Sequence, residues 1–171
     1  VDVKMPRATG IAPAIVKHLE NITITGTELQ LVEKIYFTNA SAPVTTFVSK
    51  TPTQIVVAVP GGAKKGTIKL EMASGLQTTS TAQVDVLLPA ITSFTPSPVD
   101  PGANITINGT NLDLVTAVEL QNVAPITTFV SKTATQIVVT VPNGAANGPI
   151  TLKVLNSTVT VLSAQILEIV G

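Results

Sequence analysis

The stretch TTFVSKTPTQIVVAVP at residues 45–60 decides the fold, because it returns almost unchanged as TTFVSKTATQIVVTVP at residues 127–142. Fourteen of the sixteen positions are identical. Upstream, NITITGTELQLV at residues 21–32 returns as NITINGTNLDLV at residues 104–115, with nine identities in twelve positions. Self-similarity at a fixed spacing is the signature of a repeat architecture, so the sequence predicts two consecutive copies of one structural unit.

The spacing between the copies locates a one-residue deletion. It is 83 residues for the upstream pair and 82 for the downstream pair, so the second copy has lost a residue between the two blocks. The loss falls at residues 39–44 of the first copy, where NASAP is shortened to NVAP. Because this segment is rich in Asn, Ser and Pro, we expect it to be a loop.

The same offset gives the expected domain boundaries. It places the opening VDVKMP on the VDVLLP that begins at Val84, and the final AQILEIVG also matches the AQVDVLLP that begins at Ala82. We therefore expect residues 1–6 to be the end of a preceding unit or a linker, residues 7–88 to be domain 1 and residues 89–171 to be domain 2. The adjacent domains of a longer chain are then the first expected partners.

Each copy consists of short runs rich in Val, Ile and Thr, separated by Gly, Pro, Asn or Ser. Strands and turns at roughly ten-residue spacing are typical of an antiparallel β-sandwich. In the second copy the runs predict strands at residues 90–95, 103–109, 115–121, 126–130, 135–141, 149–155 and 159–169. Helix is nearly absent, with at most one turn after Thr27 and after Thr110. The predicted fold class is all-β, with two tandem antiparallel β-sandwiches.

Alternation along the strands predicts which side chains form the core. In TQIVVAV at residues 53–59, Ile55, Val57 and Val59 share one face. In VEKIYF, Ile35 and Phe37 share a face, and the corresponding positions of the second copy are also apolar. Tyr36 lies on the opposite face, so we expect its ring to be exposed.

Composition excludes several function classes. Ten basic and ten acidic side chains give a formal net charge of zero, so no long-range field would attract nucleic acid. No apolar run approaches the roughly 18 residues of a membrane span, so we expect no membrane insertion of this segment. There is no cysteine, which excludes disulfides, thiolate metal sites and a cysteine nucleophile.

Groups for catalysis or metal binding are sparse. His18 is the only histidine, and because it aligns with Pro101 in a turn we expect a surface loop residue and no catalytic triad. No Asp-x-Asp-x-Asp loop is present, which argues against a calcium site. Glu28 with Glu33, or Asp113 with Glu119, could share one end of a unit, although solvated surface carboxylates are the favoured interpretation. We expect no enzyme activity, no cofactor and no metal.

Three stretches of the chain have a recognisable pattern: PAITSFTPSPVDPG at residues 89–102, INGTNL ending at Leu112, and TATQIVVTVPNGAANGPITLKV at residues 133–154. In these stretches the chain resembles the IPT/TIG family, which implies an all-β fold with two tandem immunoglobulin-like β-sandwiches. The resemblance covers both copies. The first copy departs at its start, where IAPAIVKHLE replaces FTPSPVDPGA, and has Glu28 where the second has Asn111.

This resemblance implies an early-set immunoglobulin fold and a mostly non-enzymatic role. Bacterial members often occur in tandem in surface and secreted proteins, including adhesins and the polysaccharide-capturing surface lipoproteins of Bacteroidetes. The family implies no universal functional residues. An extracellular or cell-surface location, as part of a bacterial outer-membrane lipoprotein, follows as an expectation.

Two function hypotheses remain open. The leading one is a semi-rigid spacer or scaffold in a cell-surface protein for polysaccharide capture or adhesion, because only about two free residues connect the copies and no Gly/Ser tether separates them. The alternative is direct binding of polysaccharide or of another surface protein. With no Trp, one Tyr and four Phe in the chain, Tyr36 is the one candidate for stacking against a ligand. Self-association through an edge strand is a further possibility.

Overall fold

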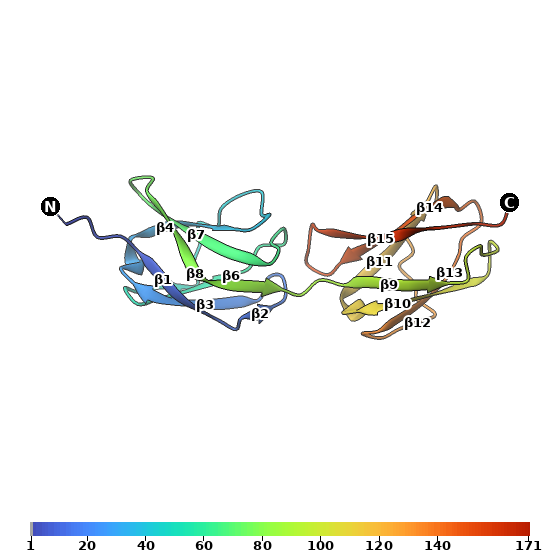
Figure 1. Ribbon diagram of the computed structural model, residues 1–171, viewed down its shortest axis with the longest axis horizontal. Helices are drawn as coiled ribbons and strands as arrows, with labels where there is room; N and C mark the ends of the chain where they lie inside the picture. The colour runs from blue at the N-terminus through green and yellow to red at the C-terminus, as the bar shows by residue number, and fades with distance from the viewer. Residues whose placement is uncertain (1) are drawn as a thin grey trace. The chain divides into compact units, whose positions relative to one another are not determined.

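The computed structural model describes residues 2–171 and contains two β-sandwiches (Figure 1). We call them unit 1, which ends at Leu87, and unit 2, which begins at Leu88. Residues 2–6 precede the first strand and have no regular secondary structure, while Val1 lies outside the described residues. The assignment of residues 1–6 to a preceding unit or linker stays a prediction.

Unit 1 is built from two four-stranded sheets. The first has the order β1 (Arg7–Ala12), β3 (Asn21–Thr27), β6 (Gln54–Ala58) and β5 (Ser49–Lys50). The second has the order β2 (Ile15–Val16), β8 (Gln77–Val86), β7 (Gly66–Met72) and β4 (Val32–Phe37). All pairs are antiparallel except β2 with β8, which is parallel.

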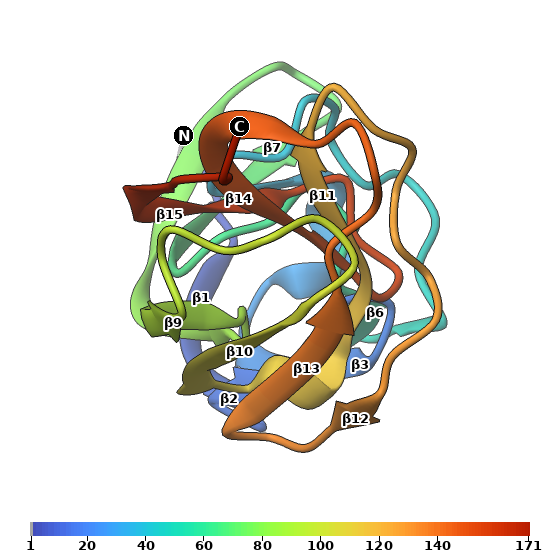
Figure 2. The ribbon, with the colours of Figure 1, turned by 90° about the vertical axis from the view of Figure 1, so that its right-hand side faces the viewer.

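Unit 2 repeats this plan. Its first sheet has the order β12 (Ser131–Lys132), β13 (Gln136–Thr140), β10 (Asn104–Thr110) and β9 (Ala90–Thr95). Its second has the order β11 (Val115–Gln121), β14 (Ala146–Val154) and β15 (Thr160–Leu167). A single parallel bridge between Val99 and Ile169 takes the place of β2. In Figure 2, β9, β10, β13 and β12 form one layer of this unit, and β14 and β15 lie in the other. The prediction of two tandem immunoglobulin-like sandwiches is confirmed.

Within residues 2–171, helical structure is limited to one 3-10 turn per unit, Leu29–Leu31 and Leu112–Leu114. They follow the second long strand of each sandwich, where a turn was expected. Each begins after a residue in the left-handed region, Glu28 with φ 54° and Asn111 with φ 51°. The two copies therefore share this backbone conformation even though their residues differ.

Most of the strands expected in the second copy are present, but the one expected at residues 126–130 is wrong. Ile126 bonds with Val118 of one sheet, whereas the Val130 N–H donates to the Val138 carbonyl of the other. Because the segment crosses from one sheet to the other, it cannot pair continuously with either. Regular pairing resumes only at the short β12.

The structure confirms the position of the deletion and corrects one alignment. Isolated bridges join Ile35 to Val44 in unit 1 and Val118 to Ile126 in unit 2. The first members of these bridges are 83 residues apart and the second members 82 apart, so the deletion falls between them, as expected.

The match of AQILEIVG with AQVDVLLP is wrong by one residue. Val84 faces Gly66 across β8 and β7, and Leu167 faces Gly148 across β15 and β14. Val84 and Leu167 are 83 residues apart, so the turn before β15 has regained the lost residue. Both are buried, whereas Ile166, which the sequence match placed on Val84, is exposed. A slip of one residue reverses the face of every side chain along a strand.

Each unit has its own apolar core. The alternation is confirmed, since Ile55, Val57, Val59 and Ile35 are fully buried and Phe37 nearly so. The core of unit 1 draws on all of its long strands, and so does that of unit 2. No residue is shared between the two clusters. Among the described residues, no helix has the length and apolarity needed to cross a bilayer.

Candidate functional site

Tyr36 lies on the outer face of the second sheet of unit 1. It is flanked on β4 by the buried Ile35 and Phe37, so its side chain points away from the core. Across the sheet it faces Lys69 of β7. The expectation of an exposed ring is only partly met, because Tyr36 is half-buried by its contacts with neighbouring polar side chains.

The carboxylate of Glu71 on β7 organises this face. The Tyr36 hydroxyl donates to its Oε2 at 3.0 Å, and the Gln77 amide of β8 donates to the same oxygen at 2.6 Å. Lys34 forms an ion pair with Oε1 at 3.1 Å. The two strands beside β7 therefore place three side chains around one anion. Hydrogen bonds to a charged acceptor are the stronger kind, which favours a fixed arrangement.

These contacts shift three ionisation equilibria. Hydrogen bonds from Gln77, Lys34 and Tyr36 lower the pKa of the Glu71 carboxyl, since they favour its charged form. The hydrogen bond to Glu71 raises the pKa of the Tyr36 phenol, because deprotonation would remove it and put two anions together. The same carboxylate raises the pKa of Lys34. The network is thus most favourable with Tyr36 neutral, Glu71 ionised and Lys34 protonated.

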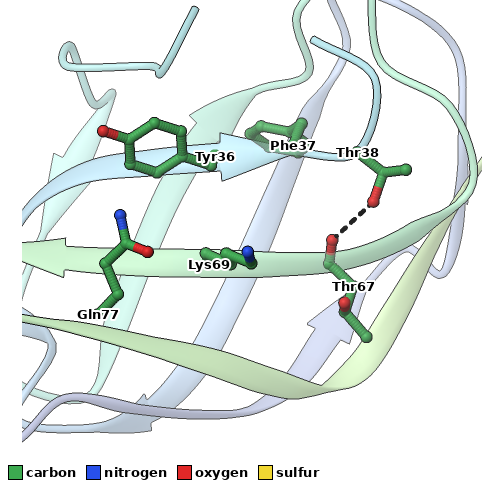
Figure 3. A pocket seen from close by; sticks show the side chains of 6 residues that line it. All are labelled: Tyr36, Phe37, Thr38, Thr67, Lys69 and Gln77. Carbon is green, nitrogen blue, oxygen red and sulfur yellow. Dashed lines mark hydrogen bonds between the residues drawn. The ribbon is translucent and has the colours of Figure 1, made fainter.

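Beside this network the surface is hollowed. Six residues from three strands and their ends line a hollow of about 460 Å³: Tyr36, Phe37, Thr38, Thr67, Lys69 and Gln77. Figure 3 shows the side chains of Tyr36 and Gln77 at one end and Thr38 and Thr67 at the other, with Lys69 between them. The Thr38 hydroxyl donates to the Thr67 carbonyl at 3.0 Å. We call this the Tyr36 hollow.

Polar groups of the Tyr36 hollow remain available to a ligand. Lys69 is exposed and has no ion pair with any residue that the structure describes. The side-chain amide oxygen of Gln77 and the Thr67 hydroxyl also lack hydrogen-bond partners within residues 2–171. The hollow thus offers a ring, a cation and uncharged hydrogen-bonding groups. A few convergent polar groups in a concave site are what small-ligand binding requires.

The corresponding surface of unit 2 has different chemistry. A hollow of about 230 Å³ there is lined in part by Glu119, which takes the position of Tyr36, and by Thr151, which takes that of Lys69. Lys153 of β14 pairs with Glu119 at 3.6 Å. With no ring and no unpaired cation, this surface lacks the features that make the Tyr36 hollow a candidate site.

His18 is not a surface loop residue, and that expectation is wrong. It is only 3% exposed, and its Nε2 lies 2.8 Å from the carbonyl oxygen of Ala63. The Ala63 carbonyl is the polar partner that a buried histidine needs. The alignment with Pro101 was misleading, because Pro101 is exposed in unit 2 whereas His18 is buried in unit 1. His18 therefore has a packing role.

The acidic residues do not assemble into a site. Glu28 pairs with Lys4 at 3.3 Å and Glu33 with Lys50 at 3.3 Å, and Glu119 is paired within its own sheet. Within the described chain, residues 2–171, no three His, Asp or Glu side chains gather in a way that could hold a metal ion. Glu28, Glu33 and Glu119 are therefore each paired with a lysine and not with another carboxylate.

The phenylalanines contribute to packing. Phe37 is buried, while Phe47, Phe94 and Phe129 pack half-buried against the cores. Lys50 and Lys132 place their ammonium groups 5.5 Å and 4.9 Å from the ring centres of Phe47 and Phe129. Each lysine also donates to a carbonyl of the opposite sheet, Val32 at 2.7 Å and Val115 at 2.8 Å. The repeated FVSK sequence was the available signal for this inter-sheet contact, which sequence reasoning missed.

Comparison with protein families agrees with this architecture. The model of the IPT/TIG domain matches twice, at residues 6–86 and 89–167. No curated protein sequence matches the chain at a significant level.

Several solved structures are similar over nearly all of the chain. One is the SGBP-B protein of the Bacteroides ovatus mixed-linkage glucan utilization locus in complex with a mixed-linkage heptasaccharide, at 20% identity, 97% coverage of this chain, 46% of that chain and a TM-score of 0.43. Another is a surface glycan-binding protein of Prevotella bryantii, at 17% identity, 98% and 43% coverage and a TM-score of 0.44. The extracellular region of plexin A4 matches at 18% identity, 97% and 18% coverage and a TM-score of 0.44. The chain spans less than half the length of each of these proteins.

Proposed function

Because the chain belongs to the IPT/TIG domain family, we propose that it is a non-catalytic extracellular module. Its two units act as a semi-rigid spacer or scaffold in a bacterial cell-surface protein. That protein serves polysaccharide capture or adhesion and is an outer-membrane lipoprotein of the kind found in Bacteroidetes. The module's first partners are then the adjacent domains of a longer chain.

The observation that carries the spacer proposal is the way the connecting backbone is held. The Leu87 N–H donates to the Val16 carbonyl of unit 1 at 2.9 Å. The next residue, Leu88, accepts a hydrogen bond at 3.2 Å from the side-chain amide of Asn111 in unit 2. Pro89 follows, with its fixed φ. Because each end of the connection is bonded within its own unit and a proline follows, we expect it to have less freedom than a Gly/Ser tether.

The spacer proposal is tested by replacing this module with an unrelated one in the native protein. Deleting residues 7–171 should abolish glycan capture or adhesion by the cells, while replacing them with an unrelated tandem immunoglobulin-like pair of equal length should restore it. If the replacement fails although the protein is displayed normally, the residues of this module itself are required. A native protein with an intact mass near 17.6 kDa would also contradict the proposal, since no further domain would be there to hold.

The Tyr36 hollow supports a second candidate function, direct binding of polysaccharide or of another surface protein. Its volume of about 460 Å³ falls within the roughly 300–1,000 Å³ of small-ligand sites. Tyr36→Ala should abolish such binding, and Glu119→Ala at the corresponding position of unit 2 is the matched control. Equal binding by both variants and the parent chain would remove Tyr36 from the site.

A further inference from the structure

The charge balance of the Tyr36 hollow carries an inference about its ligand. Lys34 and Glu71 cancel one another, because they form an ion pair at 3.1 Å. Lys69 adds one positive charge that no described carboxylate offsets. Counting Lys34, Glu71 and Lys69 as +1, −1 and +1 leaves a local charge of +1 in a chain whose formal net charge is zero.

The carboxylate of Glu71 beside the hollow is already bonded to other side chains, and no ion pair joins it to Lys69 within the described residues. Its Oε1 bonds with Lys34, and its Oε2 accepts from both Tyr36 and Gln77. The side chain of Glu71 is only 12% exposed. Lys64, whose backbone N–H donates to the Thr38 carbonyl at 2.9 Å, adds a second exposed lysine to this part of the unit. An anionic group on a ligand would therefore meet a free ammonium and no competing acid.

The uncharged groups around Lys69 fit a sugar ring. The Tyr36 ring offers an apolar face, and its hydroxyl is fixed by Glu71 rather than free to rotate. The side-chain amide oxygen of Gln77 and the Thr67 hydroxyl can form hydrogen bonds with sugar hydroxyls, because neither has a hydrogen-bond partner within the described part of the protein. Binding to side chains already held in place costs less conformational entropy.

We propose that the Tyr36 hollow binds an anionic glycan, with the acidic group of one sugar against the Lys69 ammonium and the sugar face against Tyr36. This inference rests on the second candidate function and specifies its ligand class. The hollow of unit 2, which has Thr151 in place of Lys69, lacks this specificity.

Tyr36 allows a direct test, because it is the only tyrosine of a chain without tryptophan. Its fluorescence and calorimetric heats are followed during titration of the whole chain with alginate oligosaccharides, dextran sulfate and uncharged dextran. We expect the anionic probes to bind and dextran not to bind. Affinity should fall as salt rises from ~0.05 M to ~0.5 M, because a single exposed charge contact is screened.

Two matched lysine variants test whether the preference for anionic ligands depends on Lys69. Lys69→Met should lower affinity about threefold to fivefold, as expected for an exposed ion pair, and should remove most of the salt dependence. Lys17→Met, which removes the same charge from an exposed site outside the hollow, should bind like the parent chain.

Each outcome of the titration bears on the inference. Binding of dextran sulfate without alginate would support the anionic class and assign sulfate rather than carboxylate. Equal binding of uncharged dextran, unaffected by Lys69→Met, would overturn the inference and leave the second candidate function intact. If no probe changes the Tyr36 signal or gives heat, the anionic-glycan inference is overturned, whereas the second candidate function, which includes binding of another surface protein, and the spacer proposal are unaffected.

Discussion

The hydroxyl of Tyr36 is the residue-scale feature that distinguishes the candidate site from an ordinary sheet surface. A free phenol would rotate in solvent, but this one donates to a carboxylate that also accepts from Gln77 and pairs with Lys34. The ring is thereby held in one position. The absorbance and fluorescence of this ring can be followed without an added label, because the chain has no other tyrosine and no tryptophan.

We predict that Glu71→Gln lowers the pKa of Tyr36 towards its ordinary value. Glu71 raises this pKa through its hydrogen bond, so the stability that the neutral phenol contributes is complete below the ordinary phenol pKa. It is lost as pH rises through the raised, folded-state pKa. The ultraviolet absorbance of tyrosinate during alkaline titration measures the shift. Glu33→Gln, which removes a carboxylate paired with Lys50 instead, should leave the titration unchanged.

The contribution of Glu71 to stability is lost as pH falls, whereas that of Tyr36 is lost as pH rises. The pKa of Glu71 is lowered, chiefly by the Gln77 amide, so its contribution to stability is complete above the ordinary carboxyl pKa. It is lost as pH falls through the lowered, folded-state pKa. Unit 1 should therefore lose stability at acid pH, and this loss should be smaller in Glu71→Gln. A thermal-unfolding series across the acid range checks this, and an identical pH dependence in both proteins would contradict it.

Glu28 has a backbone conformation that suits asparagine, the residue at the corresponding position 111 of unit 2, better than glutamate. Its φ of 54° lies in the left-handed region, where asparagine is enriched and glutamate is disfavoured. We predict that Glu28→Asn raises the midpoint of thermal unfolding of unit 1 by about 4 °C, because asparagine relieves this strain. Glu28→Gln removes the same charge without relieving the backbone and should give no gain. Equal effects of the two changes would assign the result to charge.

At the scale of strands, both units contain a register shift at which a buried serine accepts the hydrogen bond of a backbone N–H. The register of β7 with β8 shifts between Thr67 and Lys69, and the Ile68 N–H donates to the Ser80 hydroxyl at 3.0 Å. In unit 2 the Ile150 N–H donates to the Ser163 hydroxyl at 2.9 Å. Each hydroxyl in turn donates to a carbonyl two residues further on. The serines replace the ladder bonds that the irregularity removes.

We predict that Ser80→Ala lowers the unfolding free energy of unit 1 by about 1–3 kcal/mol, because it leaves a buried N–H without a partner. Ser163→Ala should act similarly on unit 2. Ser74→Ala makes the same chemical change in an exposed turn and should have little effect. Urea unfolding of each variant measures the difference, and equal midpoints for Ser80→Ala and Ser74→Ala would show that the irregularity needs no side-chain partner.

The strands of this fold could be predicted from sequence more readily than the site. Alternation placed Ile55 and Val57 in the core because burial of one face leaves a period of two in the sequence. The segment at residues 126–130 could not be assigned in this way, since its hydrogen bonds belong to two sheets. His18 and Ser80 were missed for a related reason. Each is a polar group buried against a backbone partner distant in sequence, and such pairs leave no periodic signal.

The candidate site was predictable only as a single residue. Tyr36 was recognised because it is aromatic and lies on the solvent side of a strand. Its partners Glu71 and Gln77 come from other strands, and only the pairing of β4 with β7 and of β7 with β8 brings them beside Tyr36, which the sequence does not show. Lys69 likewise becomes part of the site only through cross-strand pairing.

For the whole molecule, the two copies have kept one core and changed one surface. Tyr36 of unit 1 corresponds to Glu119 of unit 2, and the Lys34–Glu71 pair is replaced by a Glu119–Lys153 pair. Core positions tolerate little change because interiors are closely packed, whereas exposed sheet faces are free to vary. A tandem chain can thus combine a shared scaffold with a binding site on a single unit, which makes spacing and binding compatible roles.

The connection between the units gives the last prediction. Leu87 is bonded within unit 1 and Leu88 within unit 2, so if the proposed semi-rigid connection holds, a Gly-Ser-Gly-Ser segment inserted between them should loosen it. We expect nitrogen-15 relaxation to show shorter rotational correlation times for both units, because flexibly linked domains tumble more independently. The same segment inserted into the exposed turn at residues 73–75 lengthens the chain equally and should leave these times almost unchanged. If the parent chain already shows independent tumbling, its connection is not semi-rigid, and the role of this module must rest on what its surface binds.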